Sequence, residues 1–360
     1  MWTRPYGQTG EDVSIIGFGG MRFDNPADID GNAEIVHYAY EKGINYFDTA
    51  PGYGNQKSES IMGAAFKQMD RQKILVSTKS NAATPGALRK DLETSLKRMG
   101  VEVIDFFHIW WVTTLEAWRQ RVDGGAVAEA VKAKEEGLIK HLAISSHLPG
   151  EQLGEVLTEG PLEGVLLGYC AINFPYRQAA VELAGRRGMG VVTMNPLGGG
   201  LIPQNAGRFD FIRTPDDDTV VTAALRFNVS NPNVTCALVG VTSKDHVDQA
   251  VAAVENFQPY DAEHIASIRE NILEAFDGLC TGCGYCLPCP EGIDVPKMMD
   301  AYNLLALKDA EAAKDRLKYH WTLSPAEASA CSQCGVCEER CTQHLPIRDR
   351  LKEIAELADE

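Results

Sequence analysis

The stretch VSIIGFGGMRFDNPADIDGNAEIVHYAYEKGINYFDTA, residues 13–50, holds one full repeat of the pattern that decides the fold. A short apolar run, VSIIGFG, precedes a segment with helical spacing, GNAEIVHYAYEKG, and a second apolar run, INYFDTA, follows it. Continuous apolar runs separated by helices are typical of parallel strands that are covered on both faces. The stretch therefore predicts a strand–helix–strand unit.

The same alternation continues along most of the chain. Six further apolar runs follow, each separated from the next by a helix-like stretch: KILVSTK, VIDFFHIWWV, LIKHLAISS, GVLLGYCAI, MGVVTMNPL and VTCALVGVT. A doubly wound sheet would fit this alternation, but no G-x-G-x-x-G follows an early strand, and GFGGM lacks that spacing. Eight runs fit the eight strands of an α/β fold of the (β/α)₈ barrel type.

The last quarter of the chain is organised around cysteine. Eight of the ten cysteines lie in CTGCGYCLPCP, residues 280–290, and CSQCGVCEERC, residues 331–341. Each window holds a C-x2-C-x2-C triplet followed by a fourth cysteine. Clustered thiols in a reducing compartment indicate metal or redox chemistry. Two structural zinc sites are the less favoured alternative, because zinc ribbons use separate C-x2-C pairs.

The windows resemble the two-cluster ferredoxin run C-x2-C-x2-C-x3-C-P, whose fourth cysteine binds the other cluster. Two departures concern the fourth cysteines: Cys289 follows its triplet after two residues instead of three, and no proline follows Cys341. The resemblance implies two [4Fe–4S] clusters. One would take Cys280, Cys283, Cys286 and Cys341, and the other Cys331, Cys334, Cys337 and Cys289.

The segments around these windows have helical spacing, in residues 296–318 and 345–360. This module therefore resembles an α-helical ferredoxin-like domain. We expect a barrel over residues 1–272 and a small all-α iron–sulfur domain over residues 273–360.

Charge and hydropathy restrict the partners. The net charge of −16 disfavours nucleic acid and anionic membranes, since both are polyanions. The first residues lack the basic-then-apolar layout of a signal peptide, and the longest apolar run, residues 106–112, is too short to span a bilayer. We expect a cytoplasmic protein without nucleic-acid or membrane partners.

Several segments of the barrel resemble the aldo-keto reductase family. They are YGQTGEDVSIIGFGGM (6–21), FDTAPGYGN (47–55), STK (77–79), LAISSH (142–147), VVTMNPLGGGL (191–201) and ALVGVTSKDHVDQAV (237–251). The resemblance covers roughly residues 1–258, and the whole chain resembles the branch of that family with a C-terminal ferredoxin-like domain. It implies an NAD(P)H-dependent oxidoreductase that acts on a carbonyl or alcohol.

The expected active site combines a phenol, an ammonium and a carboxylate. Tyr53 is the candidate proton donor, but a free phenol titrates near ~10, too high for easy proton transfer at neutral pH. We expect Lys79 to lower that pKa and Asp48 to hold Lys79 in place. All three fall at or just after the C-terminal ends of predicted strands, where barrels place their chemistry. The resemblance assigns the same roles.

The family's fourth catalytic residue, a histidine, is displaced. In IDFFHIWW, aligned without a gap, Trp110 takes its place and His108 stands two residues earlier. Because side chains alternate along a strand, His108 and Trp110 share a face, and Trp111 is expected on the other, against helices. His108 either reaches the pocket, directly or through water, or is a buried histidine with a structural partner.

The resemblance also implies a binding site for NADP or NAD. Met194 stands where an aromatic side chain stacks on the nicotinamide, and Leu166 replaces a glutamine. Lys244 and His246 are available to a 2′-phosphate, but no arginine stands there, so the choice of dinucleotide is open. The expected contacts are Ser145, Ser146, Met194, Leu197, Gly240, Thr242, His246 and Gln249.

Two functions follow from these observations. The first is a reductase for a small carbonyl or alcohol, for example a sugar derivative, whose clusters stabilise the domain or couple it to a redox partner protein. The alternative is an electron-transfer or redox-sensing protein whose barrel binds a ligand without hydride chemistry. Asp48, Tyr53 and Lys79 favour the first, and the changed histidine, glutamine and aromatic positions favour the second.

Overall fold

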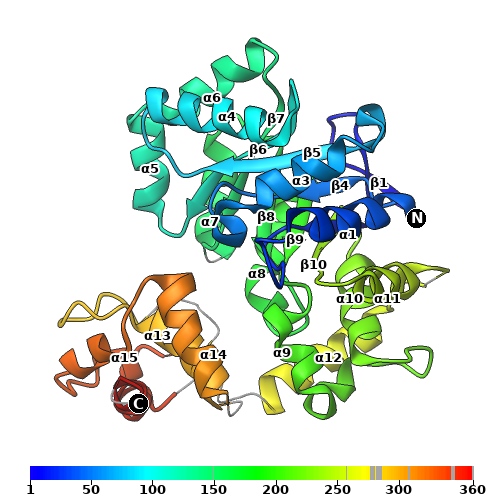
Figure 1. Ribbon diagram of the computed structural model, residues 1–360. Helices are drawn as coiled ribbons and strands as arrows, with labels where there is room; N and C mark the ends of the chain where they lie inside the picture. Colours follow the sequence, from blue (N-terminus) through cyan, green and yellow to red (C-terminus); the bar gives the residue numbers. More distant parts are fainter. Residues whose placement is uncertain are drawn as a thin grey trace. The chain divides into compact units, whose positions relative to one another are not determined.

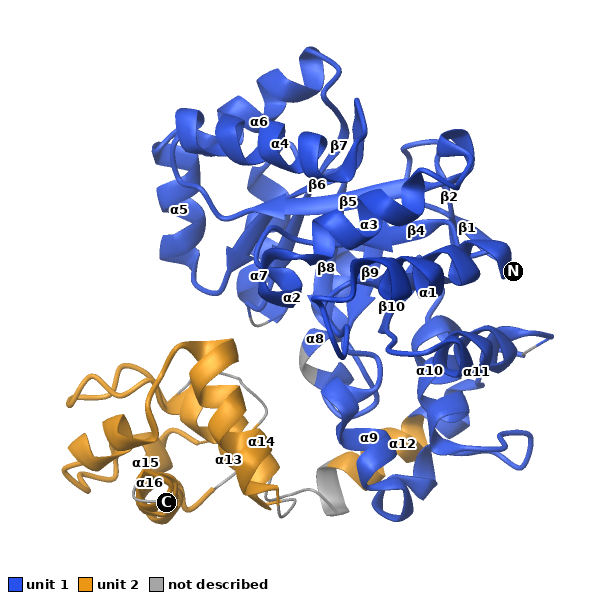
Figure 2. Cartoon of the chain, viewed as in Figure 1, with its two compact units in different colours: residues 1–265 blue, residues 266–360 orange. Residues whose placement is uncertain are grey.

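The computed structural model describes residues 1–148, 150–256, 258–275, 280, 286–306, 309–341 and 345–358. The chain forms two compact units, Met1–Ile265 and Ala266–Glu360, which are coloured separately in Figure 2. Within the described residues, no helix is long and apolar enough to cross a membrane.

The first unit is built on a closed barrel of eight parallel strands (Figure 1). Each predicted apolar run contributes one strand, and β10 pairs with β3 to close the ring. The (β/α)₈ prediction is therefore confirmed. The strands are β3 (Ile16–Gly19), β4 (Tyr46–Asp48), β5 (Leu75–Ser80), β6 (Ile104–Val112), β7 (Ile139–Ser146), β8 (Gly164–Gly168), β9 (Gly190–Met194) and β10 (Cys236–Gly240).

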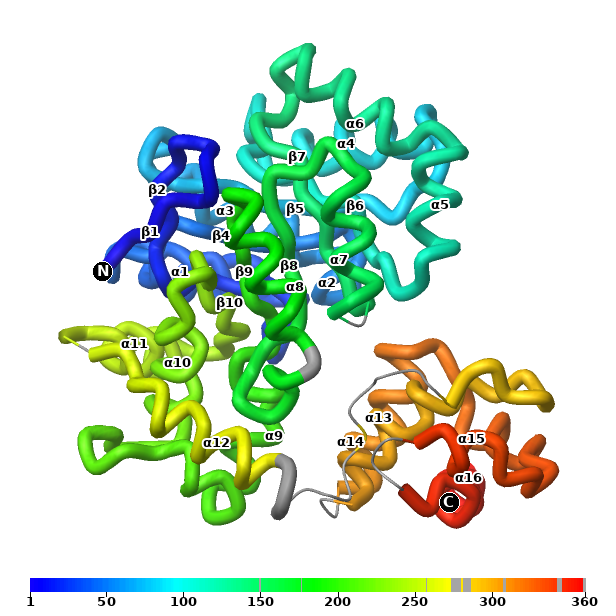
Figure 3. Tube along the Cα trace, turned by 180° about the vertical axis from the view of Figure 1, so that it is seen from behind, coloured from blue at the N-terminus to red at the C-terminus, as the bar shows by residue number. Residues whose placement is uncertain are grey.

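Helices surround this barrel, as Figures 1 and 3 show from opposite sides. Neighbours along the ring pack against each other, for example α3 on α1 and on α4, and α7 on α8. The helices of this unit are α1 (Ile29–Glu41), α2 (Tyr53–Gln56), α3 (Ser58–Phe66), α4 (Pro85–Met99), α5 (Leu115–Asp123), α6 (Ala126–Glu135), α7 (Gly150–Glu159), α8 (Phe174–Arg186), α9 (Leu201–Gln204), α10 (Val220–Ser230) and α11 (Lys244–Val254). A further helix, α12 (Ala262–Ala275), begins in the first unit and continues into the second.

Tyr6 fills the end of the barrel where the strands begin. It follows β1 (Thr3–Pro5), which pairs with β2 (Asp12–Ser14) in an antiparallel hairpin. Its ring is fully buried against Phe106, at 4.2 Å between ring centroids. Gly164 and Gly190 are the first residues of β8 and β9, and a Cβ on either would overlap Tyr6. This packing fills the N-terminal end of the barrel, and the C-terminal end is the one where barrels of this type place their chemistry.

The second unit is helical over the residues that the structure describes. After α12, its helices are α13 (Val295–Ala306), α14 (Ala310–Asp315), α15 (Val336–Glu339) and α16 (Ile347–Glu356), with a π-helical turn at Arg316–Trp321 and a 3₁₀ turn at Pro325–Ala330. Apolar residues of α13 and α16 form its core together with the cysteines Cys286, Cys337 and Cys341. The predicted all-α ferredoxin-like architecture is confirmed.

Candidate active site and iron–sulfur pocket

A buried ion pair joins the C-terminal ends of β4 and β5. The Lys79 ammonium donates to both carboxylate oxygens of Asp48, at 2.5 and 2.6 Å, and to the Thr49 carbonyl at 2.8 Å. Desolvation lowers the pKa of Lys79 and raises the pKa of Asp48, and the attraction between the two groups opposes both shifts. An isolated charge is costly in such a place, so each residue depends on the other.

Tyr53 begins α2 and lies beside this pair. Lys79 Nζ is 5.2 Å from the centroid of the Tyr53 ring. Burial and then the charge of Asp48 raise the pKa of the Tyr53 phenol. The expected lowering of this pKa is therefore not found in the chain alone, because burial has the largest effect on the phenol and the Asp48 carboxylate adds to it.

His108 lies deeper in the barrel, with no exposed surface. Its Nε2 is 3.0 Å from Ser77 Oγ and 3.4 Å from Tyr46 Oη. Ser77 donates in turn to Asp48 Oδ2 at 2.7 Å. Of the two interpretations that the sequence left open, this geometry favours a buried histidine with structural partners. Sequence reasoning missed Ser77, although a serine two residues before Lys79 shares its face of the strand.

The tryptophans at the end of β6 differ from expectation. Trp110 meets the Tyr53 ring edge-on, with 5.8 Å between centroids and 86° between planes. The Trp111 ring stacks on Trp110, with 6.2 Å between centroids and 25° between planes. Trp111 therefore does not point to the opposite face of the strand. The pairing of β6 with β7 shifts register between Ile109 and Val112, and such bulges re-aim side chains. The expectation that Trp111 faces away from Trp110 is wrong for this reason.

The predicted dinucleotide contacts lie at the ends of three strands and on one helix. Ser145 and Ser146 end β7, Met194 ends β9 with Leu197 three residues beyond it, and Gly240 ends β10. Thr242 precedes α11, while His246 and Gln249 are exposed on that helix. All eight residues therefore fall at the C-terminal side of the barrel, where the Asp48–Lys79 pair also lies.

Three of these residues already have partners. The Ser146 hydroxyl donates to the Val112 carbonyl at 2.9 Å and accepts from the Leu148 N–H at 3.1 Å. His246 Nδ1 is 3.1 Å from Thr242 Oγ1, which ties the first turn of α11 to the end of β10. Ser146 is thus engaged in holding its loop, whereas the buried Ser145 is the better candidate to hold an amide.

An arginine stands beside Gly240, where sequence reasoning found none. Arg22 follows β3, which neighbours β10 in the ring. Its Cγ would lie 2.7 Å from a Cβ at Gly240, so glycine leaves the space that the arginine stem occupies. The two residues are more than 200 positions apart, and only the closure of the barrel brings them together.

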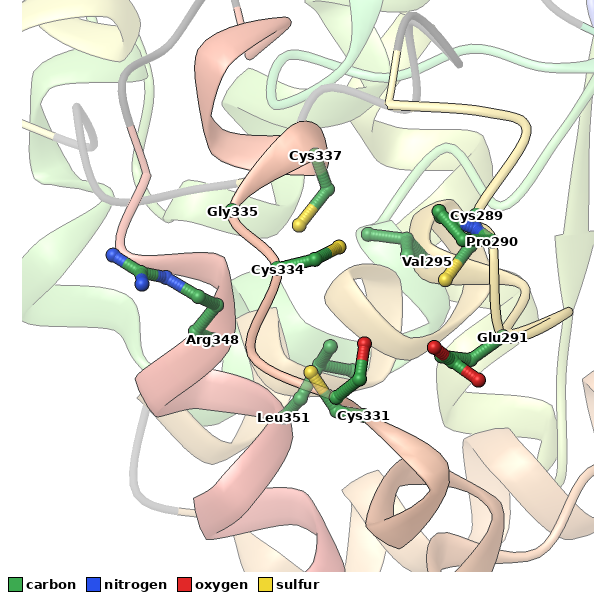
Figure 4. Close-up of a pocket in the computed structure, with 11 residues that line it drawn as sticks. Cys289, Pro290, Glu291, Val295, Cys331, Cys334, Gly335, Cys337, Arg348 and Leu351 are labelled. Atoms are coloured by element: carbon green, nitrogen blue, oxygen red, sulfur yellow. The ribbon is translucent and has the colours of Figure 1, made fainter.

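Four of the predicted cysteines line one pocket in the second unit. Cys289 meets Cys331, Cys334 and Cys337 there, and Figure 4 shows their sulfur atoms around a common space. This is the set that the ferredoxin resemblance assigned to one cluster. Arg348 also lines the pocket and binds Glu338, with its Nε 2.8 Å from the carboxylate.

The other predicted set is described in part, since Cys283 lies outside the described residues. Cys286 and Cys341 are buried in the core of the unit, with Cys280 packed against it. Asn303 on α13 holds the main chain of Cys280 by accepting from its N–H at 2.7 Å and donating to its carbonyl at 2.9 Å. Sequence reasoning missed Asn303, because nothing in its spacing connects it to the cysteine windows.

Comparison with known proteins agrees with this geometry. The model described as "Aldo/keto reductase family" matches residues 15–272. The chain belongs to the aldo-keto reductase family. A second model, described as "4Fe-4S dicluster domain", matches residues 279–345. This aldo-keto reductase is therefore an oxidoreductase that carries an iron–sulfur domain.

Similar proteins include several named oxidoreductases. "Probable aldo-keto reductase 1" of Glycine max is 31% identical over 209 residues, which are 54% of this chain and 59% of that protein. "L-galactose dehydrogenase" of Arabidopsis thaliana is 26% identical over 308 residues, 77% of this chain and 95% of that protein. "NADH-specific methylglyoxal reductase" of Escherichia coli (strain K12) is 23% identical over 327 residues, 76% of this chain and 98% of that protein.

A solved structure shares the fold of the barrel. The holo form of aldo-keto reductase AKR11C1 from Bacillus halodurans superimposes with a TM-score of 0.66 and is 24% identical. The match covers 75% of this chain and 96% of that one.

Proposed function

We propose that this aldo-keto reductase exchanges hydride between NAD(P)H and a small carbonyl or alcohol, with Tyr53 as the proton donor. The observation that carries the proposal is the buried Asp48–Lys79 pair with Tyr53 beside it. A buried ion pair beside a phenol at the C-terminal end of a barrel is the arrangement that we expect for proton transfer to a substrate oxygen.

The chemistry assigned to the chain is proton transfer. When bound, the nicotinamide supplies the hydride that attacks the carbonyl carbon, and the electrons of the broken C=O π bond pass to oxygen. Tyr53 Oη donates its proton to that oxygen, which leaves an alcohol, and solvent then returns a proton to the phenolate. Because burial and Asp48 raise the pKa of Tyr53, the phenol is protonated at neutral pH and carries the proton that the transfer requires.

The proposed cofactor site runs across the C-terminal ends of the strands. Ser145 would hold the nicotinamide amide, and Met194 offers a polarizable side chain to the ring. Gly240, Thr242, His246 and Gln249 would receive the adenosine end. Arg22 adds a guanidinium beside Gly240, where it would bind a phosphate of the dinucleotide.

We also propose that the second unit binds two [4Fe–4S] clusters. One would be held by Cys289, Cys331, Cys334 and Cys337, which already line one pocket. The other would be held by Cys280, Cys283, Cys286 and Cys341. Such clusters exchange single electrons, and Cys334 is exposed, so a redox partner protein is the proposed route by which electrons enter or leave.

The relatives suggest the range of substrates. One is named for L-galactose oxidation and another for methylglyoxal reduction, so we propose a small aldehyde, ketone or sugar as the substrate. The alternative function, electron transfer or redox sensing with a barrel that only binds a ligand, is favoured by one observation. Trp110 stands at the position of the family's histidine and contacts Tyr53.

One experiment separates these functions. Anaerobically purified protein is titrated with NADH and NADPH while nicotinamide fluorescence and cluster absorbance near ~400 nm are followed. Steady-state oxidation of both dinucleotides is then measured with methylglyoxal, L-galactose and simple aldehydes. Turnover of any carbonyl that Tyr53→Phe abolishes supports the reductase. Tight dinucleotide binding with no turnover on the whole panel contradicts it and favours the alternative.

A further inference from the structure

A chain of hydrogen bonds runs from the barrel interior to the Asp48–Lys79 pair. Tyr46 Oη, His108 Nε2 and Ser77 Oγ follow one another at 3.4 and 3.0 Å, and Ser77 donates to Asp48 Oδ2 at 2.7 Å. The residues come from the adjacent strands β4, β5 and β6. All of these side chains are buried, so bulk water does not compete for the bonds.

Proton counting fixes the direction of these bonds. An ionised carboxylate only accepts, so the Ser77 hydroxyl donates its single proton to Asp48. Ser77 Oγ can then only accept from His108, which requires the imidazole proton to be on Nε2. The lone pair is left on Nδ1, which has no hydrogen-bond partner among the described residues.

The His108 ring is also held in its neutral form. Burial and the ammonium of Lys79 lower the pKa of His108 to about 3, and the nearby backbone of Ile144, which makes no hydrogen bond to Nδ1, opposes the shift only in part. A neutral ring with its proton on Nε2 acts as a fixed hydrogen-bond donor at neutral pH and does not exchange protons there.

We propose that His108 and Ser77 are positioning residues: His108 orients the Ser77 hydroxyl, and Ser77 holds the Asp48 carboxylate in place against Lys79. The inference rests on the proposed hydride chemistry at Tyr53. Neither residue touches the substrate in this scheme. Without the Nε2–H donor, the Ser77 hydroxyl is free to turn toward Tyr46 Oη, and Asp48 loses one of its donors.

Titratable groups from several elements of the barrel influence the Asp48–Lys79 pair. Lys79 is influenced by Asp48 and Glu59, and Asp48 by Lys79 and Ser77. Among the described residues, the other titratable groups that interact with Asp48 are neutral phenols and one buried thiol: Tyr6, Tyr46, Tyr53 and Cys236.

Four variants test the proposal by steady-state reduction with the full chain. Ser77→Ala removes the donor to a charged group, and we expect kcat to fall about 10- to 100-fold. Without this donor the Asp48 anion is less stable, and its weaker attraction lowers the pKa of Lys79. The alkaline limb of the pH profile of kcat/KM should therefore move to lower pH. His108→Leu should cause a smaller loss, about 10-fold. His108→Gln, whose amide can donate from a similar place, should stay within about threefold of the parent.

The fourth variant, Ser77→Ala with His108→Leu, is decisive. If His108 acts through Ser77, the leucine adds less than about twofold to the loss caused by Ser77→Ala alone. A full 10-fold loss in both backgrounds would show that His108 acts on the substrate directly, and the proposal would be overturned.

A measurement that needs no turnover separates this inference from the proposed function. In ¹⁵N-histidine-labelled protein, the His108 signal is the one that His108→Gln removes. It should show a proton on Nε2, with Nδ1 unprotonated, and no titration between about pH 5 and 9. A proton on Nδ1, or titration near ~6.5, refutes the chain of bonds whether or not the protein is a reductase.

Discussion

Replacing Tyr53 with phenylalanine should abolish most reductase activity while leaving the fold intact. The substitution keeps the ring, and with it the edge-on contact to Trp110 at 5.8 Å and the position 5.2 Å from Lys79 Nζ. Only the hydroxyl is lost. Burial and the charge of Asp48 are the causes of its raised pKa, and no hydrogen bond from a described residue is among them. The free energy of unfolding should therefore change by less than about 0.5 kcal/mol.

The expected kinetic loss is large by comparison. General acid catalysis is typically worth about 10²–10⁴-fold, so kcat should fall by that factor, or by about 3–5 kcal/mol in activation free energy. The dissociation constant of NADPH should remain within about twofold, because the proposed cofactor contacts lie on other residues. The assay is steady-state NADPH oxidation with the carbonyl panel, accompanied by fluorescence titration of the dinucleotide.

Tyr6→Phe is the matched control. Its hydroxyl is buried without a hydrogen-bond partner among the described residues, at the opposite end of the barrel. Removing an unsatisfied buried hydroxyl should leave kcat unchanged and leave stability equal or higher by about 1 kcal/mol. If Tyr53→Phe turned over like the parent while His108→Gln was inactive, the assignment of the proton donor would be wrong.

Two further predictions concern packing and cofactor binding. Gly164→Ala places a methyl group against Tyr6 and should destabilise the barrel by about 1–3 kcal/mol in chemical denaturation. The control Gly86→Ala, with open space around it on α4, should be neutral or stabilising. Equal losses of stability in the two variants would contradict the packing argument. Cys334→Ala should lower the iron content from close to about eight to about four per chain, whereas Cys170→Ala in the barrel should retain all of the iron. Stoichiometric zinc after expression with adequate iron would refute the cluster assignment.

The sequence by itself determined the class of fold and the chemistry of the two units. Eight apolar runs separated by helical segments were enough to predict the barrel, because strands covered on both faces must be continuously apolar. The cysteine triplets were enough to predict the iron–sulfur module, because the spacing of ligands within a short window is a local property of the sequence. The match of residues 15–272 to the aldo-keto reductase family confirms the resemblance that the motifs carried.

The tertiary structure decided which side chains meet. Alternation along a strand predicted that Trp111 would face away from Trp110, but a shift in the pairing of β6 with β7, which involves a second strand, stacks the two rings. Arg22 and Gly240 are distant in sequence, and only closure of the barrel between β3 and β10 makes them neighbours.

The electrostatics of the active site also depended on three dimensions. The sequence identified the ammonium of Lys79 and the phenol of Tyr53, but the sign of the pKa shift depends on burial and on where Asp48 lies relative to both. Likewise, the role proposed for His108 depends on its contact with Ser77 at 3.0 Å, which the register of the paired strands sets. The sequence shows which ionisable groups are available. Their charge states depend on the distances between them and on the local dielectric, and both are set only when the strands have paired.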